Sequence, residues 1–239
     1  MIAENLKKVE DKIAESCIKC ERNRSEIRLI AVSKTQPIEV IREAINTGIK
    51  DFGENKAQEL RDKSDLISGM INWHFIGHLQ TNKVKYVIKA AEFIHAVDSI
   101  KLADEINRKS KEINKNQKVL LEIKTSDEAT KFGLVNEKEI FEVAHFCKKN
   151  SNLDLVGLMT MAPYTDDESV IRNCFIQLRR LKEKLNKNGF TLSELSMGMT
   201  NDYTIAIEEG ATILRIGTAI FGDRLTGKYE EIINKAGTK

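Results

Sequence analysis

Hydrophobic and polar positions alternate along the chain with two different periods. After a first stretch with helical spacing (residues 3–22), each short apolar run is followed by a polar turn and then by a segment with an apolar residue every three or four positions. The apolar runs predict strands at residues 27–32, 49–52, 73–76, 93–97, 119–123, 153–158, 192–195 and 212–216. The segments between and after them predict helices at residues 38–46, 56–67, 82–90, 100–114, 137–149, 167–188, 203–208 and 228–233.

A repeated strand–helix unit of this kind is typical of a closed parallel barrel. We therefore expect an α/β protein with a single (β/α)8 TIM barrel, an extra N-terminal helix, and one domain spanning residues 1–239. A doubly wound open sheet is the alternative. Its G-x-G-x-x-G signature does not follow the first predicted strand, so the barrel is favoured.

Charge and composition narrow the class of protein. The chain carries 38 Lys and Arg against 36 Asp and Glu, so it has no excess positive field that would hold nucleic acid or an anionic membrane. No apolar run approaches the roughly 20 residues that span a bilayer, and the N-terminal stretch lacks a signal-peptide core. We expect a cytoplasmic, monomeric protein with reduced cysteines, including Cys17 and Cys20 on the first helix, where a second metal-binding pair is missing.

Lys34 is the most informative single position. In a parallel barrel the chemistry sits at the carboxyl ends of the strands, and Lys34 follows the first strand directly. Strand alternation puts Ile30, Val32 and Lys34 on one face, so an inward-facing strand would carry the lysine to the barrel mouth. Burial there favours the neutral amine, which is the nucleophile that a Schiff base requires. The alternative is an ordinary solvated lysine.

The last strand and the strand before it supply candidate phosphate ligands. Gly217 lets backbone N–H groups approach an anion and Thr218 adds a hydroxyl, while Ser196 and Gly198 provide the loop after the seventh strand. Arg215 is predicted to point inward and to need an acceptor, for which a structural ion pair with a glutamate is the alternative explanation. With Lys34, these groups indicate a phosphorylated aldehyde as ligand.

Two histidines, His74 and His78, lie near the end of the third predicted strand, and His95 and Asp98 lie near the end of the fourth. A barrel metallohydrolase is therefore an alternative, but the spacing spans strand ends and loops instead of one helix face. We expect no metal site, and we expect His74 to lie beneath the ligand.

Five segments together resemble the pyridoxal phosphate homeostasis proteins. They are AVSKT at 31–35, FGEN at 52–55, HFIGHLQTNK at 74–83, LSMGMT at 195–200 and RIGTAIFG at 215–222, in family order across nearly the whole chain. The resemblance implies a barrel like the N-terminal domain of alanine racemase, with pyridoxal 5′-phosphate (PLP) held as an internal aldimine on Lys34. Departures are small: Thr200 stands where the family commonly has serine but keeps a hydroxyl, and Ala211 stands where serine is frequent.

The resemblance also implies roles for individual residues. Asn55 would line the site, Arg215 would face the pyridine nitrogen, and Ser196, Gly217 and Thr218 would hold the phosphate. The full set of predicted cofactor-binding residues is Lys34, Asn55, His74, Ser196, Gly198, Thr200, Arg215, Gly217 and Thr218.

Arg215 argues for binding instead of catalysis. PLP stores carbanion charge best when its pyridine nitrogen is protonated, and a guanidinium, which only donates, keeps that nitrogen unprotonated. Only a short segment follows Gly222, so we expect no second domain to close the site. The resemblance implies a protein that maintains intracellular PLP without established turnover. PLP-dependent apo-enzymes are candidate partners, and the sequence leaves open which of them, if any, receive the cofactor. A PLP-dependent amino-acid racemase or lyase, and an aldolase using Lys34 on a sugar phosphate, are the alternatives.

Overall fold

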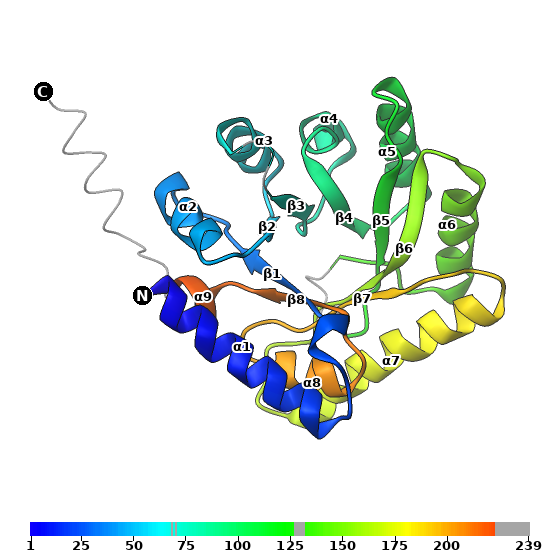
Figure 1. Ribbon diagram of the computed structural model, residues 1–239. Helices are drawn as coiled ribbons and strands as arrows, with labels where there is room; N and C mark the ends of the chain where they lie inside the picture. The colour runs from blue at the N-terminus through cyan, green and yellow to red at the C-terminus, as the bar shows by residue number, and fades with distance from the viewer. Residues whose placement is uncertain (68, 70, 127–131, 223–239) are drawn as a thin grey trace, which may run out of the picture.

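Eight parallel strands close into a barrel, with neighbours following chain order from β1 to β8 (Figure 1). The structure is a computed structural model that describes residues 1–67, 69, 71–126 and 132–222. The strands are β1 (Arg28–Val32), β2 (Asp51–Glu54), β3 (Asn72–Phe75), β4 (Ala91–Val97), β5 (Gln117–Glu122), β6 (Leu153–Met159), β7 (Glu194–Ser196) and β8 (Ile213–Ile216). The closed barrel confirms the predicted (β/α)8 fold and excludes the doubly wound sheet.

Helices cover the outside of the barrel (Figure 1). They are α1 (Ile2–Lys19), α2 (Ile38–Asn46), α3 (Ala57–Leu66), α4 (Val84–Val87), α5 (Ile100–Glu112), α6 (Glu137–Lys149), α7 (Glu168–Lys187), α8 (Tyr203–Glu208) and α9 (Thr218–Phe221), with short 3₁₀ turns η1 (Arg24–Glu26) and η2 (Thr81–Lys83). No helix in the described part of the chain combines the length and hydropathy that crossing a membrane requires.

Several boundaries differ from the predictions. The predicted helix at 82–90 is a 3₁₀ turn followed by the short α4, and α9 was not predicted. The strands predicted at 49–52 and 192–195 lie further along the chain, as β2 and β7. Strand β2 continues through Gly53, where the prediction had ended it. A Cβ at this position would lie 2.9 Å from Ile30 Cγ2, so the glycine permits close packing inside the barrel. The predicted helix at 228–233 lies outside the described residues, and the single domain over 1–239 stays a prediction.

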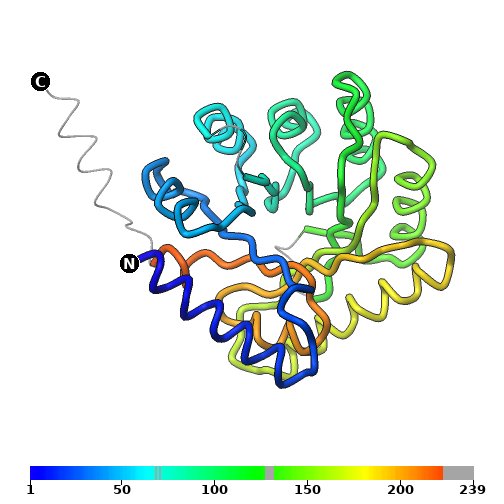
Figure 2. Tube along the Cα trace, in the orientation of Figure 1, coloured from blue at the N-terminus to red at the C-terminus, as the bar shows by residue number. Residues whose placement is uncertain are grey.

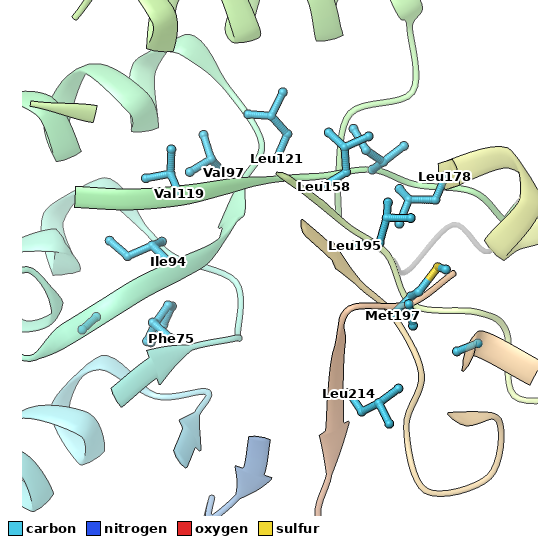
Figure 3. Packing of buried hydrophobic residues seen from close by; sticks show 14 of the residues in the cluster. Phe75, Ile94, Val97, Val119, Leu121, Leu158, Leu178, Leu195, Met197 and Leu214 are labelled. Atoms are coloured by element: carbon cyan, nitrogen blue, oxygen red, sulfur yellow. The ribbon is translucent and has the colours of Figure 1, made fainter. Parts of the chain in front are cut away.

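Apolar side chains pack in two layers, as strand alternation predicts. An inner cluster fills the barrel and consists of Ile30, Phe93, Leu120, Met159 and Ile213. The opposite strand faces pack against the helices, as Figure 3 shows for Val119, Leu121 and Leu158 on the strands and Leu178 on α7. This double burial explains why the strands read as short apolar runs with few polar interruptions.

The extra N-terminal helix α1 is present and packs beside α8 and α9, as the trace in Figure 2 shows. Ile13 on its inner face is fully buried, and Asn5 Nδ2 donates a hydrogen bond to the Ile220 carbonyl at 3.1 Å. Cys17 on this helix and Cys20 directly after it are free thiols, and burial raises the pKa of Cys17. The helix therefore supports the segment after β8.

Candidate functional site

A cavity of about 690 Å³ opens at the carboxyl ends of the strands. Six of the predicted residues lie on its wall, namely Lys34, Asn55, Thr200, Arg215, Gly217 and Thr218. They follow or end β1, β2, β7 and β8, which are far apart in sequence but meet at one rim because parallel strands end on the same side of a barrel.

Three predicted residues are not on the cavity wall. His74 and Ser196 are fully buried, and the His74 ring stacks on Phe93 with centroids 4.7 Å apart. Gly198 shapes the turn after β7: its φ is +95° and a Cβ there would approach Ala206 Cβ to 2.7 Å. The side chains of His74 and Ser196 thus belong to the interior of the barrel, outside the cavity lining. The place of His74 beneath a ligand stays a prediction.

The backbone on the N-terminal side of Lys34 is anchored by a buried ion pair. Lys63 Nζ donates to Glu54 Oε1 at 2.7 Å and to the Ser33 carbonyl at 2.8 Å. The Ser33 hydroxyl donates to the same Glu54 oxygen at 2.6 Å. Burial raises the pKa of Glu54 more than Lys63 and Ser33 lower it, so the carboxylate depends on these partners to stay charged.

The C-terminal side of Lys34 is anchored to the same helix. Glu59 Oε1 accepts from the Thr35 backbone N–H at 2.6 Å and from Lys63 Nζ at 2.7 Å. Thr35 has a φ of +66°, which a β-branched residue rarely adopts. Lys63 therefore uses its three ammonium donors to tie α3 to both flanks of Lys34. Sequence reasoning missed Lys63 and Glu59, although their i,i+4 spacing on a predicted helix was visible.

Arg215 is nearly fully buried, with 4% exposure, and is held by neutral acceptors. Its Nη1 donates to Ser196 Oγ at 2.6 Å and its Nη2 donates to the Thr160 carbonyl at 2.8 Å. Burial lowers the pKa of Arg215 to about 10, while Asp202 and Glu122 act in the opposite direction, so the guanidinium stays charged at neutral pH. Among the described residues Arg215 forms no ion pair with a glutamate, so the structural alternative is not realised in this part of the chain.

Glu122, at the end of β5, is a cavity residue that sequence reasoning missed. It is buried, and its Oε2 has no hydrogen-bond partner among the described residues. Desolvation, with Asp98 adding to it, raises the pKa of Glu122 to about 7. The signal was available, because alternation places Glu122 on the same inner face as Leu120.

The wall suits a ligand with a phosphate, a ring nitrogen and a carbonyl. Asn55 Oδ1 is buried without a partner in the described structure and is open to a ligand donor. At the start of α9, the backbone N–H groups of Ile220 and Phe221 donate to the Gly217 carbonyl. The backbone N–H groups that precede them in the chain come before the first hydrogen bond of the helix, so they can donate to an anion. Lys34 supplies an amine and Arg215 a guanidinium on the same wall.

The histidines do not form a metal centre in the described part of the chain. His74 Nδ1 lies 3.0 Å from His95 Nε2, and His78 lies 3.5 Å from Asp98 Oδ2. No group of three potential ligands gathers among the residues described. These positions give the metallohydrolase alternative no support.

Comparison with known proteins decides the family. The family described as alanine racemase, N-terminal domain, matches residues 5–225. The pyridoxal phosphate homeostasis protein of Aquifex aeolicus is 42% identical over 225 residues, covering 92% of this chain and 97% of that protein. The chain belongs to the pyridoxal phosphate homeostasis protein family. Another member, from Vibrio alginolyticus, is 40% identical and covers 93% of this chain and 97% of its own.

Solved structures agree with this family assignment. PipY of Synechococcus elongatus, solved with PLP bound, is 31% identical, covers 93% of this chain and 100% of its own, and has a TM-score of 0.81. An alanine racemase of Clostridium difficile is 17% identical with a TM-score of 0.74, and 58% of its length is covered. The latter likeness shows a shared fold only, while the family confirms the resemblance carried by the five motifs.

Proposed function

We propose that this member of the pyridoxal phosphate homeostasis family binds PLP covalently through Lys34 and maintains the cellular supply of PLP without turning over a substrate. The observation that carries the proposal is that Lys34, just after β1, and Arg215, in the neighbouring strand β8, lie on the wall of one cavity. The bound PLP of PipY and the names of the close relatives support it.

PLP supplies an aldehyde that condenses with an amine: the nitrogen forms the C=N bond and the aldehyde oxygen leaves as water. Lys34 provides that amine. The Lys63 network holds the backbone on both sides of Lys34, so the backbone there need not be reordered on binding and only the lysine side chain loses freedom.

The other wall residues bind different parts of the cofactor. Arg215 donates toward the ring nitrogen and keeps it unprotonated, because a guanidinium has no acceptor. Thr200, Gly217 and Thr218 hold the phosphate, and Asn55 lines the site through its unpartnered carbonyl oxygen. His74, Ser196 and Gly198 contribute from behind the wall.

An unprotonated ring nitrogen makes PLP a poor electron sink, which favours storage over amino-acid chemistry. The racemase or lyase alternative gains nothing from the similar alanine racemases, because their likeness is one of fold. We extend the proposal to a monomeric cytoplasmic protein that hands PLP to PLP-dependent apo-enzymes.

The test is the colour and the site of attachment. Protein incubated with PLP and purified should absorb in the visible range, and borohydride should fix the added mass to the peptide that contains Lys34. Lys34→Ala should abolish both signals, whereas the exposed control Lys89→Ala should keep them. Label on another peptide, or on none, contradicts the proposal. A colourless protein that forms an imine with a sugar phosphate would favour the aldolase alternative.

A second measurement tests the absence of turnover. The loaded protein should not exchange the α-proton of amino acids in deuterated water. If the α-proton of any amino acid exchanges and this exchange requires Lys34, the result contradicts the storage function and supports the racemase or lyase alternative.

A further inference from the structure

A continuous chain of hydrogen-bonded side chains crosses the interior of the barrel below the cavity. Arg215 Nη1 lies 2.6 Å from Ser196 Oγ, which lies 2.9 Å from His95 Nδ1. His95 Nε2 lies 3.0 Å from His74 Nδ1, and His74 Nε2 lies 2.9 Å from Asp51 Oδ1. The chain links the carboxyl end of β8 to Asp51, the first residue of β2, at the opposite end of the barrel.

The two ends determine the direction of every bond. Arg215 only donates, so Ser196 Oγ accepts at the upper end. At the lower end, Asp51 Oδ1 also accepts from Arg28 Nη1 and Asn72 Nδ2, each at 3.2 Å. Arg28 and Asn72 only donate, which favours Asp51 as a carboxylate without a proton, so its Oδ1 accepts from His74 Nε2 as well.

The middle of the chain follows from the chemistry of neutral imidazole, which has one N–H and one acceptor nitrogen. Because His74 donates from Nε2, its Nδ1 accepts from His95 Nε2. His95 Nδ1 then accepts from the Ser196 hydroxyl. Burial lowers the pKa of both histidines, His95 the more strongly, which agrees with neutral rings.

We propose that Ser196, His95 and His74 are positioning residues that hold Arg215 through a one-way chain, Arg215 to Ser196 to His95 to His74 to Asp51, with both imidazoles as neutral Nε2–H tautomers. The inference rests on the proposed function only for the role of Arg215 toward PLP. It also gives Ser196 a task different from phosphate binding, because its hydroxyl proton is used by His95.

One rearrangement competes with this assignment. If His74 carried a second proton, it would donate from Nδ1 to His95, and His95 would donate to Ser196, leaving the serine proton for a ligand. Arg28 opposes that protonation of His74, whereas Asp51 and Glu92 favour it. The two arrangements differ in the nitrogen that carries each proton, which nitrogen NMR measures directly.

The first experiment uses the protein without PLP. Nitrogen NMR of histidine-labelled protein at pH 7 should show His74 and His95 as neutral rings protonated at Nε2. A doubly protonated His74, or an Nδ1 proton on either ring, overturns the proposal. This result does not depend on whether Lys34 carries PLP.

A matched pair of variants tests positioning. In His95→Asn the amide oxygen reaches the place of Nδ1 and can accept from Ser196, whereas in His95→Gln the amide reaches the place of Nε2 and leaves Ser196 without its acceptor. The His95→Asn variant should keep a PLP affinity within about three-fold of the wild type. The His95→Gln variant should bind PLP about ten-fold more weakly or worse.

Equal PLP affinity of the Asn and Gln variants overturns the inference. If either variant fails to fold, the NMR assignment of the wild-type chain still decides it. Borohydride labelling of Lys34 should persist in both variants at saturating PLP. Failure of labelling in the wild-type chain would refute the proposed function and leave the tautomer result standing.

Discussion

Lys63 Nζ lies 2.7 Å from Glu54 Oε1 in a nearly water-free environment, with side-chain exposures of 8% and 0%. This ion pair joins α3 to the end of β2 and, through the Ser33 carbonyl, to the residue before Lys34. A buried ion pair contributes little net stability compared with apolar packing, but it is costly to break. Its location beside Lys34 indicates a role in positioning that lysine.

Lys63→Met should therefore destabilise the protein by about 3 kcal/mol or more, because it leaves the Glu54 carboxylate buried without its cation. Urea unfolding measures this loss. Lys63→Met combined with Glu54→Gln should recover part of it, whereas Lys89→Met on the surface should change little. If the single variant is as stable as the wild type, the pair does not support the Lys34 segment.

Glu122 should give the protein an unusual pH dependence. Its folded pKa is raised to about 7 from the ordinary value of 4.5, so the folded state binds more protons than the unfolded state between these values. The contribution of Glu122 to the free energy of unfolding is therefore fully present below about pH 4.5. It is lost as the pH rises toward and through 7, and the total loss is about 3 kcal/mol.

Glu122→Gln should remove that loss, so the variant should gain stability over the wild type at pH 8 and little at pH 4. Urea unfolding of the PLP-free protein across this range measures the difference. The exposed control Glu139→Gln should follow the wild-type curve. Parallel curves for Glu122→Gln and wild type would show that Glu122 titrates normally.

Arg215→Lys should not be tolerated, although it conserves charge. The guanidinium reaches Ser196 Oγ and the Thr160 carbonyl with two different nitrogens, which a single ammonium nitrogen does not reproduce. We expect PLP affinity to fall about ten-fold or more, measured by absorbance titration. Arg180→Lys on the exposed face of α7 should bind PLP as the wild type does. Unchanged affinity of Arg215→Lys would remove Arg215 from the binding set.

Gly77→Ala should disturb the site through the backbone. A Cβ at Gly77 would lie 2.3 Å from the Asn55 carbonyl oxygen, so the loop after β2 must shift. We expect a loss of about 2 kcal/mol in unfolding free energy together with weaker PLP binding. Gly189→Ala meets nothing closer than 3.8 Å and should cost about 1 kcal/mol for its left-handed backbone alone, without an effect on PLP. Equal effects of the two variants would contradict the proposed clash.

Much of the fold was predictable because its signals are local. Strand alternation and helical periodicity operate over a few residues, so the apolar pattern predicted the order of the strands and helices. A predicted strand boundary was wrong where one residue type occurs both in turns and in strands. Gly53 resembles a turn residue, but it lies within β2 and permits close packing against Ile30. The same alternation predicted that Arg215 points inward, since Ile213 on its face lies inside the barrel.

The sequence by itself determined the barrel, the rim at which Lys34, Asn55, Arg215, Gly217 and Thr218 gather, and the family, because each depends on local periodicity or on a contiguous motif. Only the tertiary structure decided that Ser196 contacts His95, 101 positions away, and that Lys63 reaches Ser33 from a neighbouring helix. The first contact arises when the barrel closes and brings inward side chains of distant strands within bonding distance, and the second arises when α3 packs against the end of β1. The residues next to each partner in the sequence do not indicate which group it will contact. The hydrogen-bond partner of a buried polar group depends on the whole fold.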